Sequence, residues 1–128
     1  MTQEAFISIL DKKGYSYKIE GDRIVVTHGG IVGLDSLTSL PPGVEFKNGF
    51  HVYLDSLTSL PLGVEFKNKG GVWLDSLTSI SPGVEFRNKG GVLLRDLIGR
   101  FGDWNGNIEG IDSKRLLNKM IKQGVFER

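Results

Sequence analysis

The feature that most constrains this chain is an eight-residue phrase that returns at a fixed interval. "LDSLTSLP" occupies residues 34–41 and 54–61, and "LDSLTSIS" follows at 74–81, so the period is 20 residues. The phrase "VEFKN" or "VEFRN" returns with the same period, starting at residues 44, 64 and 84. A period of about 20–50 residues is typical of a stacked solenoid, because one repeat alone cannot bury its apolar surface. The repeat therefore predicts a solenoid.

Each repeat contains two segments with the pattern of a strand. In the first, Val44 and Phe46 alternate with charged residues, which is the two-residue period of a half-buried strand. In the second, Val52 and Leu54 flank Tyr53 in the same way. The leucines of the intervening phrase recur every third residue, which favours a turn or a 3₁₀-like arc. We expect coils that run strand, corner, strand, arc and corner, about 4.8 Å from the next coil.

The two ends of the chain carry helix signals instead of repeats. Residues 2–14 begin with Thr2 as N-cap and stop at Gly14, and residues 112–124 form a second amphipathic pattern. Segments 15–19 and 23–27 flank Glu-Gly-Asp, which predicts a hairpin. We expect a mainly β, α+β fold: a short β-solenoid or leucine-rich-repeat-like stack of roughly four coils, capped by an α-helix at each end. The expected single domain, 1–128, divides into a helix-and-hairpin cap (1–22), the solenoid (23–99) and a loop-and-helix cap (100–128).

Composition excludes several classes of protein. Sixteen basic and fifteen acidic residues leave a net charge of +1, too little to attract nucleic acid or an anionic membrane by field alone. The absence of cysteine excludes disulfides and cysteine-based zinc sites. We see neither a signal-peptide pattern nor an apolar run of the roughly 18 residues that a membrane helix needs. These features predict a soluble, cytoplasmic protein.

Residues that suggest catalysis belong to the repeat. Asp35, Ser36 and Ser39 would suit a Ser-His-Asp site, but the same Asp and Ser return in each repeat without a matching histidine. Capping of nearby backbone amides explains them better. His28 and His51, the only histidines, lack the spacing of metal ligands. We expect no enzyme, no cofactor and no metal.

One further segment resembles a cation site only in part. In "DWNGNIEGID" (103–112), acidic and amide residues alternate as they do in a calcium loop. The sixth and twelfth positions, which should be Gly and Glu, are Ile108 and Lys114. A turn that leads into the second helix is the preferred interpretation.

Charged residues form ladders along the stack. The sequence places Glu45, Glu65 and Glu85 in one column and Lys47, Lys67 and Arg87 in the next. We interpret this as a solvated face with weak ion pairs. The alternative is a nucleic-acid contact through these three cations together with Lys69 and Lys89. The Asn column at 48, 68 and 88 is predicted to lie inside, with its amides bonded along the stack.

One outward column changes while its neighbours are constant. It consists of Gly33, Tyr53, Trp73 and Leu93. Outward Tyr and Trp on a rigid sheet are residues that anchor interfaces, so this column is the leading partner-binding site. Alternatives are packing beneath a cap helix, a homodimer contact, or a platform for a small molecule or sugar. A second candidate surface is Phe50 with His51, together with Phe101 and Trp104.

A family resemblance rests on these motifs. "LTSLPPGVEFKN" (37–48) resembles the short leucine-rich repeats of bacterial effectors, over residues 24–99 at most. In those repeats the Asn follows the second strand leucine by three residues, whereas Asn48 follows Phe46 by two, which favours a flatter β-solenoid coil. The layout is also similar to uncharacterised small repeat proteins of phages and bacterial mobile elements.

The resemblance implies a function as well as a fold. We expect a protein-binding module, more specifically a small phage-encoded inhibitor of a host or defence protein (anti-CRISPR-like) that acts by steric occlusion. The alternatives are a nucleic-acid-binding protein that uses the Lys/Arg ladder, and a structural or self-associating homodimeric unit.

Overall fold

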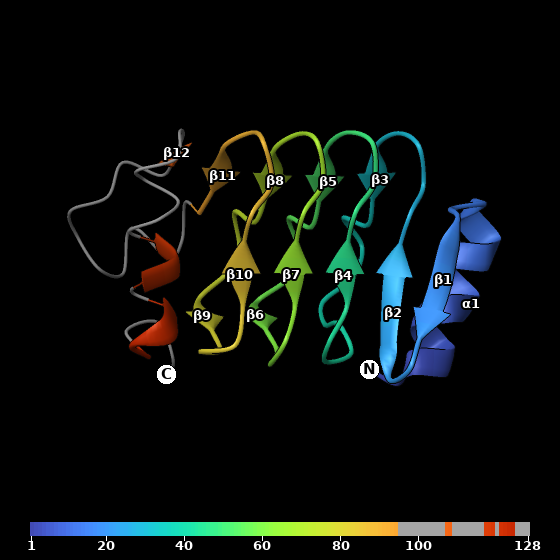
Figure 1. Cartoon of the computed structure of the whole chain (residues 1–128), viewed down its shortest axis with the longest axis horizontal. Helices are drawn as coiled ribbons and strands as arrows, with labels where there is room; N and C mark the ends of the chain where they lie inside the picture. The colour runs from blue at the N-terminus through green and yellow to red at the C-terminus, as the bar shows by residue number, and fades with distance from the viewer. Residues whose placement is uncertain (95–106, 109–116, 120, 125–128) are drawn as a thin grey trace.

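The computed structural model describes residues 1–94, 107–108, 117–119 and 121–124, and it shows a short β-solenoid of about three turns (Figure 1). A fourth turn expected from the repeat would include residues 95–99, which lie outside the described residues. The strands of the turns are short. They are β3 (Val32–Gly33), β4 (Glu45–Phe46), β5 (Val52–Tyr53), β6 (Ser59–Leu60), β7 (Glu65–Phe66), β8 (Val72–Trp73), β9 (Ser79–Ile80), β10 (Glu85–Phe86) and β11 (Val92–Leu93).

Parallel pairing places like residues on top of one another. One sheet has the order β1-β2-β4-β7-β10, where β1 spans Tyr17–Glu20 and β2 spans Arg23–Val26. A second has the order β12-β11-β8-β5-β3, where β12 spans Asn107–Ile108. Glu45 lies beside Glu65, and Val52 beside Val72, so the register equals the 20-residue period. The predicted direct stacking of the repeats is therefore confirmed.

The predicted arc contains a third, smaller sheet. Strands β6 and β9 pair in parallel, with Ser59 beside Ser79 and Leu60 beside Ile80. Leu60 and Ile80 are buried and the two serines are not, so this segment has its own two-residue period. The leucines spaced by three stay inward because the chain turns tightly after Leu54, where Leu57 N donates to Leu54 O at 3.1 Å. The second and third repeats consequently each contribute strands to three sheets.

The core consists of columns of identical side chains. Phe46, Phe66 and Phe86 are buried, and their rings are nearly parallel, with centroids 5.1 and 5.0 Å apart. This separation follows from the spacing of paired strands, about 4.8 Å. The contact between identical rings thus repeats with each coil.

A buried asparagine column joins the corners, as the sequence predicts. Asn48, Asn68 and Asn88 are buried at equivalent positions. The Asn68 Nδ2 donates to the carbonyls of Gly70 and Gly71 in its own corner, both at 3.1 Å, and to that of Phe50 in the preceding corner, at 3.0 Å. Each amide therefore holds its own corner and the one before it.

The N-terminal segment folds as its helix and hairpin signals predict. Helix α1 (Gln3–Lys13) begins after Thr2, whose hydroxyl accepts a hydrogen bond from Ala5 N at 3.1 Å, and ends at Gly14 with φ 74°. Strands β1 and β2 pair in antiparallel fashion, and β2 continues into the sheet through β4. The helix contributes Phe6 and Leu10 to the core.

The two ends of the stack have side-chain bonds at their strand edges. At the first end, Gly33 N of β3 donates to Tyr15 Oη at 3.0 Å. At the other, helical residues occur at 117–119 and 121–122, with Leu117 and Ile121 in the core. Asn118 Oδ1 accepts from Phe86 N at 2.7 Å, and its Nδ2 donates to Phe86 O at 2.8 Å. A side-chain amide there pairs with both backbone groups of one β10 residue.

Removal of one amide from the asparagine column should destabilise the fold. Asn68→Ala removes the three hydrogen bonds that a buried amide makes to two corners, so we expect the free energy of unfolding to fall by about 2–3 kcal/mol. Urea denaturation followed by circular dichroism measures this change. The neighbouring exposed Lys69→Ala is the control, with an expected change within about 0.5 kcal/mol. Equal stabilities of the two variants would contradict the role given to the column.

Candidate binding groove

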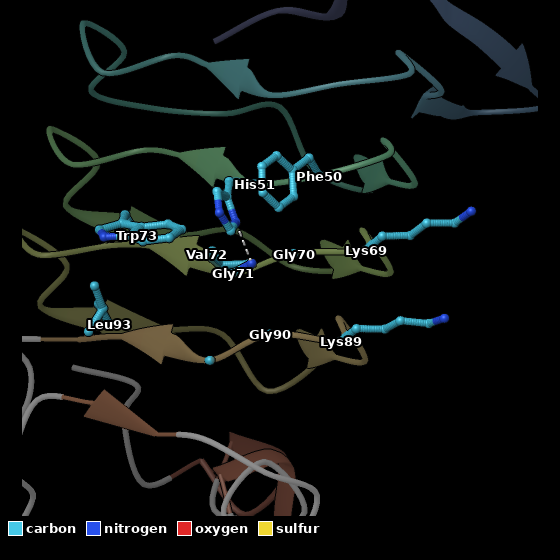
Figure 2. A pocket seen from close by; sticks show the side chains of 11 residues that line it. Phe50, His51, Lys69, Gly70, Gly71, Val72, Trp73, Lys89, Gly90 and Leu93 are labelled. Atoms are coloured by element: carbon cyan, nitrogen blue, oxygen red, sulfur yellow. Dashed lines mark hydrogen bonds between the residues drawn. The ribbon is translucent and has the colours of Figure 1, made fainter.

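A groove forms where one corner of the stack departs from the repeat. Residues 49–51 read Gly-Phe-His, whereas both 69–71 and 89–91 read Lys-Gly-Gly. The parallel register puts Phe50 and His51 at the positions of Gly70 and Gly71 in the next coil. The rings of Phe50 and His51 therefore lie next to glycine backbone of the next coil, and a cavity of about 500 Å³ opens beside them (Figure 2). We call this cavity the corner groove.

The corner groove has an apolar end and a basic end. Figure 2 shows Trp73 and Leu93 on one side of the view and the side chains of Lys69 and Lys89 on the other. His51 lies between these two groups in the view. The groove therefore offers a ring surface and positive charge within one site.

Glycine is required in the floor of the groove. A Cβ atom on Gly71 would lie 2.8 Å from Trp73 Cζ3, and one on Gly90 would lie 2.6 Å from Gly71 N. A Cβ on Gly70 would clash with the His51 ring. The repeat pattern predicts these glycines only as corner residues; the structure shows that they let the rings and the next coil approach closely.

The rings beside the groove form one continuous cluster. Tyr53 and Trp73 stack, with centroids 4.6 Å apart and planes at 29°. His51 meets Trp73 edge-on at 4.7 Å, and Phe50 stacks on His51 at 3.7 Å. The sequence predicts two separate aromatic surfaces here, and the structure joins them. We call Phe50, His51, Tyr53 and Trp73 the aromatic cluster.

The predicted outward column is present in the second sheet. Tyr53 lies beside Trp73, and Trp73 beside Leu93, in parallel register. All three side chains are half-buried, while Phe50 is 46% exposed. Phe101 and Trp104, the other residues of the second candidate surface, lie outside the described residues.

His51 has a defined role that its sequence position does not suggest. Its Nδ1 accepts a hydrogen bond from Gly71 N at 2.9 Å (Figure 2). A nitrogen that accepts carries no proton, so the neutral ring has its hydrogen on Nε2. This bond fixes the ring against Trp73. The signal in the sequence is that His51 replaces a glycine of the neighbouring repeats.

The basic candidates separate into two sets. Lys47 and Lys67 each lie 3.2 Å from a Glu45 carboxylate oxygen, and Arg87 lies 2.7 Å from that of Glu85. By contrast, Lys69 and Lys89 have no acidic partner in the part of the chain that the structure describes. Lys47, Lys67 and Arg87, which we call the ladder cations, are therefore paired with glutamates of the same chain. The groove lysines, Lys69 and Lys89, are available to an external anion.

Glu45 does not lie on the solvated face that the ladder predicts. It is only 6% exposed, and Arg23 Nη1 lies 3.9 Å from its carboxylate. The Arg23 guanidinium donates to Gly43 O at 3.0 Å and to Gly63 O at 2.7 Å, which links two corners. Arg23 lies outside the three clear repeats, so periodicity does not reveal this contact.

The ion-pair network shifts two pKa values. Burial raises the pKa of the Glu45 carboxyl, but hydrogen bonds with the side chains of Glu65, Lys47 and Lys67 outweigh burial and hold its pKa below the ordinary value. The hydrogen bond from Lys67 to Glu45 also raises the pKa of the Lys67 ammonium. Both pKa shifts mean that the folded protein favours the charged forms of Glu45 and Lys67.

Two further findings concern the described part of the chain only. It contains no cluster of three or more side chains suited to hold a metal ion. None of its helices combines the length and apolar character needed to cross a membrane.

No protein family, curated protein or solved structure matches this chain. The likeness to leucine-rich repeats and to small phage repeat proteins gains no support from these comparisons.

The lowered pKa of Glu45 predicts a stability that depends on pH. A carboxyl whose pKa is lower in the folded state stabilises the fold above the pKa of the unfolded chain, and this contribution is lost as the pH falls through the folded pKa. Between about pH 6 and pH 3, wild type should therefore lose more free energy of unfolding than Glu45→Gln. Glu85→Gln, which changes a side chain that is 40% exposed, should lose nearly as much as wild type. Urea titrations across this range measure the three slopes, and parallel slopes for wild type and Glu45→Gln would contradict the network.

Proposed function

We propose that this protein is a non-enzymatic module that binds another protein through the corner groove and the aromatic cluster. The observation that carries the proposal is that two sets of residues that depart from the repeat lie side by side. Phe50 and His51 replace glycine where the groove opens, and Tyr53 and Trp73 occupy an outward column that varies between constant neighbours. Residues needed only for stacking would return in each coil.

The physical properties of the cluster support binding. Tyr and Trp supply large contact areas and are enriched among residues that dominate interface energies. Here they are held before any partner arrives, since Trp73 is stacked on Tyr53 and contacts the ring of His51. Rings fixed in this way lose little conformational freedom on binding. The groove volume, about 500 Å³, also suits insertion of a side chain or a short segment.

The mechanism that follows is steric. A rigid stack presents one face, and a partner bound to that face has the covered part of its own surface blocked. The identity of that partner as a host or defence protein stays a prediction, as does a phage origin. In this proposal the segments with α1 and with helical residues 117–119 and 121–122 are scaffold that covers the two ends of the stack, where unpaired strand edges would promote aggregation.

Nucleic-acid binding is the weaker proposal. Its ladder cations, Lys47, Lys67 and Arg87, each lie beside a glutamate, which reduces the positive potential that phosphates need. The favourable observation is the groove itself, because single-stranded nucleic acids bind to rings next to cations.

Truncation of the two stacked rings tests the main proposal. Tyr53→Ala/Trp73→Ala should lose partners that wild type captures, with an affinity loss of at least about tenfold once a partner is identified. Affinity capture from lysate with mass spectrometry, followed by binding measurements with the purified partner, gives the result. Circular dichroism establishes that each variant folds.

The matched control removes exposed apolar side chains elsewhere. Ile19 and Leu62 are 60% and 63% exposed and lie outside the groove, so Ile19→Ala/Leu62→Ala should keep the partner. The milder Phe50→Ala addresses the same cluster with less risk to folding. The proposal fails if the folded double ring variant binds the partner as tightly as wild type does. Size-exclusion chromatography of the free protein tests the alternative, a homodimer that covers the rings.

A further inference from the structure

Building on the proposed function, we infer that the partner segment in the corner groove is an acidic stretch of peptide with an aromatic or aliphatic anchor. Its carboxylates meet Lys69 and Lys89, and its anchor packs against Trp73 and Leu93. The inference concerns the chemistry of the partner, which the proposal above leaves open.

The basic end of the groove carries two neighbouring like charges. Lys69 and Lys89 occupy equivalent positions in neighbouring coils, and their side chains extend in the same direction in Figure 2. Adjacent coils lie about 4.8 Å apart, so the two side chains start from neighbouring backbone positions. Among the described residues that line the groove none is acidic. A bound carboxylate would offset the repulsion between the two ammonium groups.

The ladder of charged residues next to the groove has both signs of charge, unlike the groove. Two residues before each groove lysine stands a cation, Lys67 or Arg87, that has a glutamate of its own chain as partner. Among the described residues, carboxylates thus accompany the ladder and none lines the groove. Charge complementarity therefore assigns an acidic occupant to the groove. Exposed ion pairs between the peptide and the two lysines would add modest affinity. Their main effect is on specificity and association rate.

The distance between the two ends of the groove limits the spacing within the peptide. Lys69 and Trp73 are four residues apart in sequence, so the backbone between them spans at most about 14 Å. An extended peptide covers that distance with about four residues. The anchor and the nearest acidic residue should therefore lie within about four positions of each other.

The arrangement of cations favours a peptide over a nucleic acid. A nucleic-acid strand needs cations along a row of phosphates. Among the described residues, the cations that would extend such a row beyond the two groove lysines are the paired ladder residues. The net charge of +1 provides no long-range attraction for a polyanion. A short peptide with one or two carboxylates fits Lys69 and Lys89 better.

A library selection tests the inference before any partner is identified. Random heptapeptides displayed on phage would be selected against immobilised wild type, Lys69→Glu/Lys89→Glu and Lys12→Glu/Lys13→Glu. The last variant has the same change of net charge on the exposed end of α1. We expect wild type and the α1 variant to enrich peptides in which Asp or Glu lies within about four positions of an aromatic or aliphatic residue. Lys69→Glu/Lys89→Glu should lose that preference.

Synthetic peptides then give affinities. The most enriched sequence, labelled with fluorescein, should bind Lys69→Glu/Lys89→Glu at least about tenfold more weakly than wild type in anisotropy titrations, and added salt should weaken its binding to wild type. An oligo-dT of matched charge is the nucleic-acid probe. Tighter binding of oligo-dT than of the best peptide, lost in the same variant, would overturn the inference in favour of nucleic acid.

The ring variant separates failure of the inference from failure of the proposed function. If enriched peptides lack an acidic excess, or bind Lys69→Glu/Lys89→Glu as tightly as wild type, the acidic partner is wrong. The binding function still stands in that case if Tyr53→Ala/Trp73→Ala loses those peptides. If that folded ring variant enriches the same peptides as wild type, or wild type enriches none, both the groove function and the inference are overturned.

Discussion

The rest of the structure depends on in-register parallel pairing of very short strands. Each repeat strand has only two residues, too few for stability alone, so a coil is held mainly by the coils on either side. Stacked Phe46, Phe66 and Phe86 rings and the corner amides both require that identical residues lie one coil spacing apart. A shift in register would therefore remove the core contacts and the amide bonds together, because a slip of one residue moves each side chain to the opposite face.

This constraint explains why the candidate site lies at a corner. Substitutions in the inward columns disturb every neighbouring coil, whereas some outward and corner positions differ between coils that stack in the same register. Phe50 and His51 exploit this freedom: they replace small residues in one coil and overhang the glycines of the next. The groove is thus a local difference between adjacent repeats. Its rigidity comes from the scaffold beneath it, and the Gly71–His51 hydrogen bond ties the two together.

The charged residues show the same division between repeated and singular contacts. The Glu and Lys/Arg columns neutralise each other by repetition, and this pairing could be anticipated from the alternation in "VEFKN". The contact of Arg23 with Glu45 could not be anticipated, because Arg23 belongs to the hairpin and shares no period with the repeats. Likewise, no pattern in the sequence indicates that Asn118 bonds the backbone of Phe86 across 32 positions. Contacts of this kind bring together residues that share no period.

The sequence by itself determined the repeating unit: its inward leucines and phenylalanines, its asparagine column and the order in which columns meet. It could do so because the strands pair in parallel with a register of 20 residues. Residues that are 20 positions apart in the sequence are therefore neighbours in the stack. The variable column of Tyr53 and Trp73 was visible for the same reason. Only the tertiary structure decided that His51 and Phe50 join those rings, that the arc forms a third sheet, and that Lys69 and Lys89 lie apart from the paired ladder. These outcomes depend on corner geometry and side-chain direction, which a periodic pattern does not specify.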